Sequence, residues 1–363
     1  MKNERMEQLI QWMKSEDISA SLITSKANVF YLSKFYTDPH ERLVAILVFP
    51  NEAPVLIVPN MEKEQVKAVG WKYEILGYSD TDNPWEQVKE AANHSKVEKL
   101  AIEKEHMIYE RVERLNDIFG TPQLVSVEEK LHELRMIKDH QEISLLKEAA
   151  KLADYGVEVG VAAIKEGKTE LEVLATIEYE LKKKGILEMS FSTMVLTGEK
   201  TASPHGKPGL DVIKKGDLIL FDLGVVYKGY CSDITRTVAL GEVSDKKREI
   251  YETVLEAQVA ALNASKPGVK IGDIDTIART IITEKGYGEF FTHRIGHGLG
   301  IDVHEFPSMN ATNTRTLQTG MTYTIEPGIY VPGLAGVRIE DDVLITGTGF
   351  EALTTYPKEL QIL

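Results

Sequence analysis

Residues 216–224 read GDLILFDLG, and residues 320–328, about a hundred positions later, read GMTYTIEPG. Both stretches follow the order glycine, five residues, an acid, one residue, glycine, so Asp222 and Glu326 occupy equivalent places. Upstream of each, a helical segment recurs at nearly the same offset, over 165–185 and 266–286. Because repeats fix the architecture of a chain, we predict two halves, each of helices followed by an acid-bearing strand. Packed face to face, the halves would bring their acids together at a pseudo-twofold axis.

A strand–turn–strand pattern surrounds Asp222. The runs 218–227 and 230–240 are rich in β-branched and aromatic residues, and Lys228-Gly229 between them suits a two-residue turn. The pattern therefore predicts an antiparallel hairpin that brings Asp222 beside a second acid, Asp233.

The turn also sets the register of this hairpin. It places Thr235 opposite Asp222, and residues opposite each other share a face of the sheet, as do residues two apart on one strand. Asp233 is then the diagonal neighbour of Asp222, roughly 7–8 Å away at the backbone. That separation suits two carboxylates that converge on a metal pair about 3.5–4 Å across. Gly224, opposite Asp233, is expected to leave the space above it empty.

The second half repeats this construction. Gly333 is the midpoint between Glu326 and Glu340 and lies in a VPGLAG turn between two strand-like runs. A loop centred on Gly333 places the two glutamates directly opposite each other, whereas a loop offset by one residue would separate them.

Five potential metal ligands thus lie in order along the second half of the chain: Asp222, Asp233, His297, Glu326 and Glu340. Four carboxylates and one imidazole carry too much negative charge to gather without a cation. Gathered around two divalent ions, they would form a water-activating hydrolase centre.

Length, charge and cysteine content narrow the class of protein. The 363 residues favour two domains or one large one. A net charge of −14 without a basic run makes nucleic acid and anionic membranes poor partners. No apolar stretch approaches the ~20 residues of a membrane span, and the N-terminal stretch lacks the apolar core of a signal peptide. The single Cys231, interpreted as a strand-packing residue, allows no intrachain disulfide and fits a reducing cytoplasm.

The first 125 or so residues mix helices with strands, which suggests a compact α/β domain. The pattern predicts a helix at 4–14, strands at 19–24, 43–49 and 54–58, and further helix and strand candidates at 62–69, 85–93 and 99–103. Residues 127–165 are mostly helical, with an interruption near Lys138-Asp139. We predict two domains, 1–126 and 127–363.

The ordered ligand set resembles the dinuclear site of the pita-bread metallopeptidases, which include methionine aminopeptidase, aminopeptidase P and prolidase. The internal duplication and the N-terminal domain match as well, so the resemblance covers essentially the whole chain. Common methionine aminopeptidases lack such an N-terminal domain, and creatinase lacks the full metal set that is intact here. The stretch GHGLGIDVHEFPSM, residues 296–309, is most similar to prolidases (Xaa-Pro dipeptidases) of Gram-positive bacteria. The resemblance implies an α/β (α+β) fold, with a creatinase-like mixed α/β domain before a pseudo-twofold pita-bread domain.

The resemblance also implies roles for the ligands. Asp222 would chelate one metal, Asp233 and Glu340 would bridge both, and His297 and Glu326 would bind the other. An oxygen-rich set with one imidazole suits Mn²⁺ or Co²⁺ and leaves Zn²⁺ or Fe²⁺ open. In such sites a metal-bridging hydroxide attacks the carbonyl before proline, with the counterpart of Glu326 as general base.

Further residues match family positions around the substrate. His205 and His304 resemble residues that contact the substrate and the tetrahedral intermediate, and His293 resembles one that flanks the proline pocket. Arg338 could pair with an acid or bind the substrate's carboxylate, and structural pairing is at least as credible. Tyr330 matches a tyrosine near the metals, where packing is an equal alternative.

One position departs from a prolidase pattern. Some prolidases carry an arginine where Ser308 follows HEFP in this chain. The anchor for the free carboxylate of a dipeptide must then come from elsewhere, from Arg294, Arg338 or another subunit.

We expect a cytoplasmic homodimer that acts on small Xaa-Pro peptides. In related dimers a loop like 35–42, which here carries Asp38 and His40, reaches the neighbour's active site, and a solvated turn is the alternative. Prolidase is the favoured function. Aminopeptidase P, which releases the residue before proline from longer peptides, is the alternative. A non-catalytic binding module of the same fold is disfavoured because all five ligands are kept.

Overall fold

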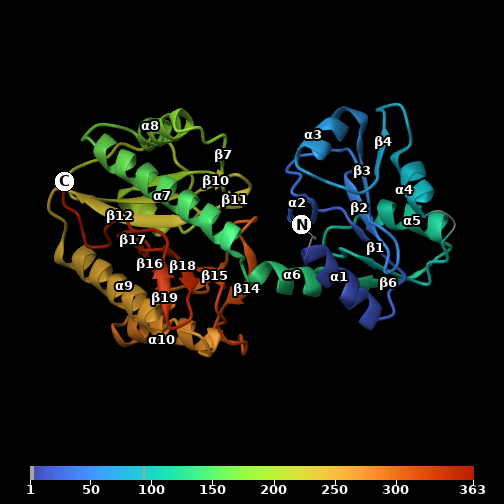
Figure 1. The fold of residues 1–363 in the computed structure, drawn as a ribbon. Helices are drawn as coiled ribbons and strands as arrows, with labels where there is room; N and C mark the ends of the chain where they lie inside the picture. The colour runs from blue at the N-terminus through green and yellow to red at the C-terminus, as the bar shows by residue number, and fades with distance from the viewer. Residues whose placement is uncertain (1–3, 93–94) are drawn as a thin grey trace. The chain divides into compact units, whose positions relative to one another are not determined.

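The chain divides between Arg135 and Met136 into two units in this computed structural model, which describes residues 4–92 and 95–363. Figure 1 follows the chain from blue in the first unit to red at the end of the second. None of the helices in these described ranges is both long and apolar enough to cross a membrane.

The first unit is built on one six-stranded sheet of order β4-β3-β2-β1-β5-β6. Strand β1 pairs antiparallel with β2 and parallel with β5, so the sheet is mixed. The strands are β1 Ala20–Ile23, β2 Ala45–Val48, β3 Val55–Pro59, β4 Ile75–Tyr78, β5 Lys99–Ile102 and β6 Gln123–Ser126. The helices are α1 Glu4–Ser15, α2 Lys26–Ser33, α3 Lys63–Ala68, α4 Pro84–Ala92, α5 Tyr109–Phe119 and α6 Glu128–Met136. The mixed α/β character predicted for this part of the chain is confirmed.

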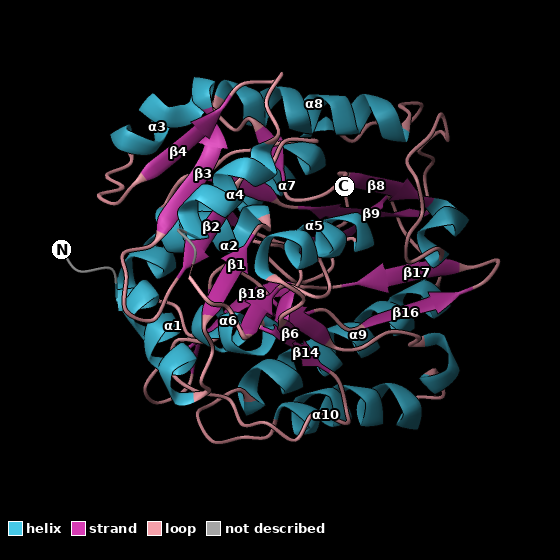
Figure 2. Ribbon diagram, turned by 90° about the vertical axis from the view of Figure 1, so that its right-hand side faces the viewer, coloured by secondary structure: helices cyan, strands magenta, loops and turns pink. Residues whose placement is uncertain are grey.

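The second unit has two layers of paired helices with strands between them. The helices are α7 His140–Ala163, α8 Glu170–Lys183, α9 Asp245–Ala264 and α10 Ile271–Glu284. One three-stranded sheet has the order β12-β9-β8, and a five-stranded sheet has the order β14-β13-β15-β18-β19. Figures 1 and 2 both show strands between α7 and α8 on one side and α9 and α10 on the other.

Two smaller sheets complete the second unit, one of order β11-β10-β7 and one formed by β16 and β17. The strands of this unit are β7 Glu188–Met189, β8 Met194–Thr197, β9 Asp217–Leu223, β10 Val225–Tyr227, β11 Tyr230–Cys231, β12 Ile234–Leu240, β13 Gly296–Gly298, β14 Glu305–Met309, β15 Thr322–Ile325, β16 Gly328–Val331, β17 Ala335–Arg338, β18 Asp341–Ile345 and β19 Phe350–Ala352.

Equivalent hydrogen bonds confirm the predicted internal repeat. After α7, the Gly167 N–H donates to the Ile213 carbonyl at 3.0 Å, and after α9 the Gly268 N–H donates to the Leu317 carbonyl at 2.9 Å. Each half also has its own core under its helix pair. In the first half, a Cβ at Gly160 of α7 would lie 2.8 Å from the Phe221 ring of β9, so glycine lets this helix lie close to its sheet.

The register predicted around Asp222 is confirmed. Thr235 is its partner across β9 and β12, and Tyr227 pairs with Tyr230 around the Lys228-Gly229 turn. The two strands are not continuous, however, because β10 and β11 leave this pair and join β7 in a separate sheet.

The space above Gly224 is filled, so the expectation that it is empty is wrong. A Cβ at Gly224 would lie 1.8 Å from the Ser232 carbonyl oxygen and 2.9 Å from the Ser190 hydroxyl oxygen. The chain closes on itself at this break in the strands, and the Ser190 N–H donates to the Gly224 carbonyl at 2.9 Å. Glycine is therefore needed here for close backbone approach.

The register of the second hairpin is also confirmed. Val331 pairs with Ala335 around Gly333, and farther along Ile325 pairs with Asp341. Both pairs have Gly333 as their midpoint, so the residues between them, Glu326 and Glu340, fall opposite each other.

Replacing Gly224 with alanine should destabilise the second unit, because a methyl group cannot fit beside the Ser232 carbonyl oxygen. We expect Gly224→Ala to lower the free energy of unfolding by about 1–3 kcal/mol, as overpacking does. Gly347→Ala is the matched control, since nothing lies within 4 Å of a Cβ built there. The thermal unfolding midpoints of both variants check this, and equal midpoints would contradict the steric account.

Candidate metal centre

The five predicted ligands come from both halves of the second unit. Asp222 lies on β9 and Asp233 immediately before β12, whereas His297 lies on β13. Glu326 follows β15, and Glu340 lies between β17 and β18. Every predicted ligand thus lies on a strand or at a strand end, where the sheets hold it in place.

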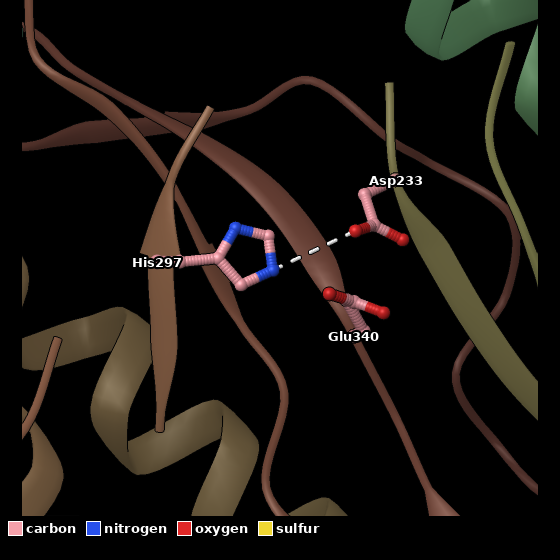
Figure 3. A group of neighbouring side chains, drawn as sticks. All are labelled: Asp233, His297 and Glu340. Carbon is pink, nitrogen blue, oxygen red and sulfur yellow. Dashed lines mark ion pairs between the residues drawn. The ribbon is translucent and has the colours of Figure 1, made fainter. Parts of the chain in front are cut away.

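Three of these side chains converge most closely. Ligand atoms of Asp233, His297 and Glu340 all lie within 4.8 Å of one another, and all three residues are buried (Figure 3). The His297 Nε2 atom lies 3.7 Å from Asp233 Oδ2 and 3.3 Å from Glu326 Oε1. The Asp222 charge raises the pKa of Asp233, Glu326 and Glu340, so Asp222 lies beside the same group.

Burial and mutual repulsion disfavour charge on these acids. Burial, followed by the charge of neighbouring carboxylates, holds the pKa of Asp233 and Glu340 well above the usual range. Burial also raises the pKa of Glu326 to about 7. Without a cation the centre therefore retains protons that free carboxyl groups would have lost at neutral pH.

His297 presents an unprotonated nitrogen to these acids. Burial, reinforced by the nearby His304, lowers its pKa to about 3, so the imidazole is neutral. Its Nδ1 atom lies 3.2 Å from the Gly298 carbonyl oxygen, which can only accept, so Nδ1 carries the proton. The lone pair of Nε2 then faces carboxyl oxygens, an arrangement that repels unless a proton or a cation lies between them.

Unpartnered oxygens show where a cation would fit. Asp222 Oδ1, Asp233 Oδ1 and Glu340 Oε1 are buried and have no hydrogen-bond partner. Buried polar atoms are nearly always satisfied, so three orphaned carboxylate oxygens beside one imidazole lone pair call for bound cations. The residues present therefore fit a centre for divalent metal ions.

Arg338 is committed to neighbours on the protein. Its Nη2 donates to Asp222 Oδ2, its Nη1 donates to the Tyr330 hydroxyl at 2.8 Å, and its Nε donates to the Thr235 hydroxyl at 3.0 Å. All three nitrogens thus have partners, which favours the structural-pairing alternative for this arginine.

His293 extends this chain of hydrogen bonds. Its Nε2 lies 2.9 Å from the Tyr330 hydroxyl, and its Nδ1 lies 2.8 Å from the Arg294 carbonyl oxygen. Burial lowers the His293 pKa to about 4, so the ring is neutral. With its proton on Nδ1, the ring accepts the Tyr330 hydroxyl proton at Nε2.

The other two predicted histidines lie near the centre. The ring of His304 is 4.1 Å from that of His297, and burial lowers its pKa. His205 is exposed, and its charge lowers the pKa of both His293 and His304, so it lies close to both. Arg294 donates from Nη1 to the Ser308 hydroxyl at 2.9 Å.

Asp38 and His40 belong to the first unit. Their side chains are 63% and 74% exposed, and the His40 N–H donates to Asp38 Oδ1 at 3.2 Å. His40 has a φ of 52°, which is typical of a turn residue.

Two residues that support the ligands were not predicted. The Thr235 hydroxyl donates to Glu340 Oε2 at 2.6 Å while it accepts from Arg338. Asp342 accepts the Asp233 backbone N–H at 3.0 Å. The predicted register already places Thr235 opposite Asp222, so the role of Thr235 could have been predicted from the sequence. The contact of Asp342 with Asp233 joins the two halves, and no local sequence pattern indicates it.

The chain is similar to known proteins along nearly its whole length. A family model described as metallopeptidase family M24 matches residues 144–347, and one described as the creatinase/prolidase N-terminal domain matches residues 5–137. A candidate dipeptidase of Bacillus subtilis is 57% identical over 361 residues, with 99% of each chain covered. The solved structure of an Xaa-Pro dipeptidase from Bacillus anthracis is 36% identical with a TM-score of 0.93 and covers 99% of each chain. That of an X-Pro aminopeptidase from Thermotoga maritima is 35% identical with a TM-score of 0.89 and covers 99% of this chain and all of that one.

Replacing Asp233 with asparagine should weaken metal binding while it stabilises the metal-free protein. The amide removes a carboxyl group whose pKa is raised by burial and by Glu340, so the metal-free folded protein no longer has to bury its charge or take up a proton at this position. We expect the affinity for Mn²⁺ to fall about 100-fold or more and the metal-free unfolding midpoint to rise. Calorimetric titration and thermal unfolding check this, with the exposed Asp117→Asn as control. Unchanged affinity would exclude Asp233 as a ligand.

Metal binding should release protons near neutral pH. The acids whose pKa is raised, including Glu326 at about 7, are partly protonated in the metal-free protein, and a metal ion must displace those protons. Affinity should therefore fall as the pH drops through about 7 and rise above it, by about tenfold per pH unit for each proton displaced. Titration calorimetry in two buffers of different ionisation enthalpy measures the released protons. A pH-independent affinity with no proton release would contradict this account.

Proposed function

The chain belongs to metallopeptidase family M24 and carries the creatinase/prolidase type of N-terminal domain, and on that premise we propose that it is an Xaa-Pro dipeptidase. The family implies divalent metal ions, and the chain buries an Asp, His and Glu group that could hold them. The observation that carries the proposal is the set of orphaned carboxylate oxygens, Asp222 Oδ1, Asp233 Oδ1 and Glu340 Oε1, in one buried centre.

In this proposal the five ligands hold two ions. Asp222 would hold one ion, His297 and Glu326 would hold the other, and Asp233 and Glu340 would contribute to both. The oxygen-rich set favours Mn²⁺, with Co²⁺ or Zn²⁺ as alternatives. Bound ions would lower the pKa of water at the centre and polarise the carbonyl group before proline.

Glu326 is the residue that we assign to proton transfer. Its Oε1 atom lies 3.3 Å from His297 Nε2, at the centre where water would be activated, so the carboxylate is placed to accept and return a proton. It would take a proton from the attacking water and deliver it to the prolyl nitrogen. That nitrogen has no hydrogen in the Xaa-Pro bond and must gain one to leave as a secondary amine.

The surrounding histidines would position the substrate. His304 packs against His297, and His205 lies near both His304 and His293. His205 and His304 would donate hydrogen bonds to the developing oxyanion. His293, held by Tyr330, would flank the proline ring.

The N-terminal unit also enters the proposal. Asp38 and His40, on their exposed turn, would act on the active site of a second subunit in a homodimer. Size-exclusion chromatography with light scattering tests this part, and a monomer at working concentration would remove it.

Aminopeptidase P activity is the second candidate. The likeness to an X-Pro aminopeptidase structure at a TM-score of 0.89 favours it almost as well as the dipeptidase structure favours the first. Both activities need the same metal centre, so only the length of the accepted peptide separates them.

The proposed activity predicts metal-dependent release of leucine from a dipeptide. We expect metal-depleted protein to be inactive, and Mn²⁺ to restore cleavage of Leu-Pro but not of Leu-Pro-Pro-Gly. Leu-Ala is the control, because it has the same length and terminal charges without the proline ring. Chromatographic measurement of free leucine decides the outcome. Release mainly from the tetrapeptide would make the chain an aminopeptidase P, and release from neither proline peptide would contradict both activities.

A further inference from the structure

The segment between the short helix η3 (Gly288–Phe290) and β13 carries His293. Its residues 291–295 have no regular secondary structure, yet Phe291 and Ile295 are buried. Backbone groups of a buried segment outside helices and sheets need hydrogen-bond partners from elsewhere. Two side chains of α10 supply them.

These two side chains, Asp275 and Arg279, lie one turn apart on α10 and form a bidentate ion pair. The Arg279 Nε and Nη2 atoms donate to different oxygens of the Asp275 carboxylate, each at 2.9 Å. The Asp275 side chain is only 1% exposed, so the carboxylate is itself held firmly. Because a guanidinium is planar, two parallel hydrogen bonds to a fixed carboxylate also fix the direction of its remaining N–H groups.

The ion pair holds the backbone on both sides of His293. The Arg279 Nη1 atom donates to the Phe291 carbonyl at 3.0 Å, and Nη2 donates to the His293 carbonyl at 2.8 Å. The Asp275 carboxylate accepts the Ile295 N–H at 3.0 Å. The pair therefore fixes the chain before, at and after the histidine.

The same ion pair also supports the position of the His293 ring. The Phe291 ring contacts the His293 ring edge-on, with 5.1 Å between the centres, and the Arg279 guanidinium lies 4.3 Å from the centre of the Phe291 ring. Tyr330, whose hydroxyl is bound by Arg338, contacts the His293 ring at 5.5 Å between the centres. Arg279 thus holds the Phe291 contact, and Arg338 holds the Tyr330 contact.

The far end of the segment is tied to the metal centre. The Ile295 carbonyl accepts the backbone N–H of Glu326, a predicted ligand, at 2.8 Å. The peptide groups of Ile295 are therefore held by Asp275 on one side and by Glu326 on the other. Movement of this segment would change the place of His293 relative to the centre.

We propose that Arg279, oriented by Asp275, is a positioning residue that sets the size of the proline pocket by fixing His293. This inference rests on the proposed function, in which His293 flanks the proline ring. Arg279 acts through the histidine and is not one of the predicted ligands. A fixed histidine leaves room for the five-membered ring of proline, whereas a histidine that can shift would also admit a larger ring.

The test compares Leu-Pro with Leu-pipecolate, in which the ring is one methylene larger, using the Mn²⁺-loaded full-length protein. We expect the unmodified protein to prefer Leu-Pro by about tenfold or more in kcat/KM. Arg279→Gln should lower this preference to about threefold or less, because the pocket is no longer held to one size. It should also raise KM for Leu-Pro about tenfold and change kcat less than about twofold, since contacts with the ring bind substrate and transition state alike.

Two further variants make the comparison specific. Arg279→Lys keeps the charge without the planar fork, so its preference and KM should lie between those of Arg279→Gln and the unmodified protein. Arg248→Gln is the matched control, because Arg248 is an exposed arginine of the same unit that pairs with the exposed Glu242. It should leave the preference, KM and kcat unchanged.

The preference between the two rings separates positioning from a purely structural role. Each variant should retain the bound Mn²⁺ of the unmodified protein, and if Arg279→Gln does not fold at the assay temperature, Arg279→Lys takes its place. An unchanged KM for Leu-Pro, an equal loss of kcat/KM on both substrates, or no preference in the unmodified protein would overturn the positioning role while the dipeptidase proposal stands. If the unmodified protein cleaves neither substrate, the dipeptidase proposal itself fails, and the positioning role fails with it.

Discussion

Burial of like charge is the constraint on which the second unit depends. Glu340 directly precedes Asp341, the first residue of β18, and the two side chains meet different neighbours. Asp341 meets Arg236 and Lys358, and these cations hold its pKa below the usual range. Glu340 meets other acids, and its pKa is held far above that range. The chain thus pairs the buried Asp341 carboxylate with cations, but one residue away it leaves several buried carboxyl groups without a cation. Bound metal ions would supply the positive charge that this centre lacks.

The internal repeat is the means by which the chain assembles such a centre. Bonds between the halves are reciprocal: the Glu340 N–H donates to the Thr235 carbonyl at 3.0 Å, and the Asp233 N–H donates to Asp342 Oδ2 at 3.0 Å. Each half therefore fixes the backbone of a ligand carried by the other. Neither half contains the whole site, so its geometry is set by the packing of the two halves and not by a local motif.

Whether a feature could be predicted from the sequence depends on whether the contacts that form it are local or non-local. The registers around Lys228-Gly229 and Gly333 could be predicted because turn residues and strand pairing are local properties. The space above Gly224 could not, since it is filled by the Ser232 backbone only after the strands break. In the first unit, β4 and β6 lie at the sheet edges, and their partly exposed residues lack the continuous apolar pattern that marked the central strands. That Arg338 pairs with an acid could be proposed from the sequence, but the choice of Asp222 as its partner depends on the other hairpin.

The interruption of the helical pattern near Lys138-Asp139 helps to position a loop beside the metal centre. The chain leaves α6 there, the Lys138 N–H donates to the Gly320 carbonyl at 2.9 Å, and Asp139 caps α7. The Lys138 ammonium then lies 3.0 Å from the Glu305 carboxylate, with both side chains almost fully buried. Glu305 also accepts the backbone N–H groups of Ile301 and Asp302, so the pair fixes the loop between β13 and β14. That loop carries His304, whose ring packs on His297. A buried ion pair contributes little net stability, and its role here is to fix the loop that carries His304 beside the metal centre.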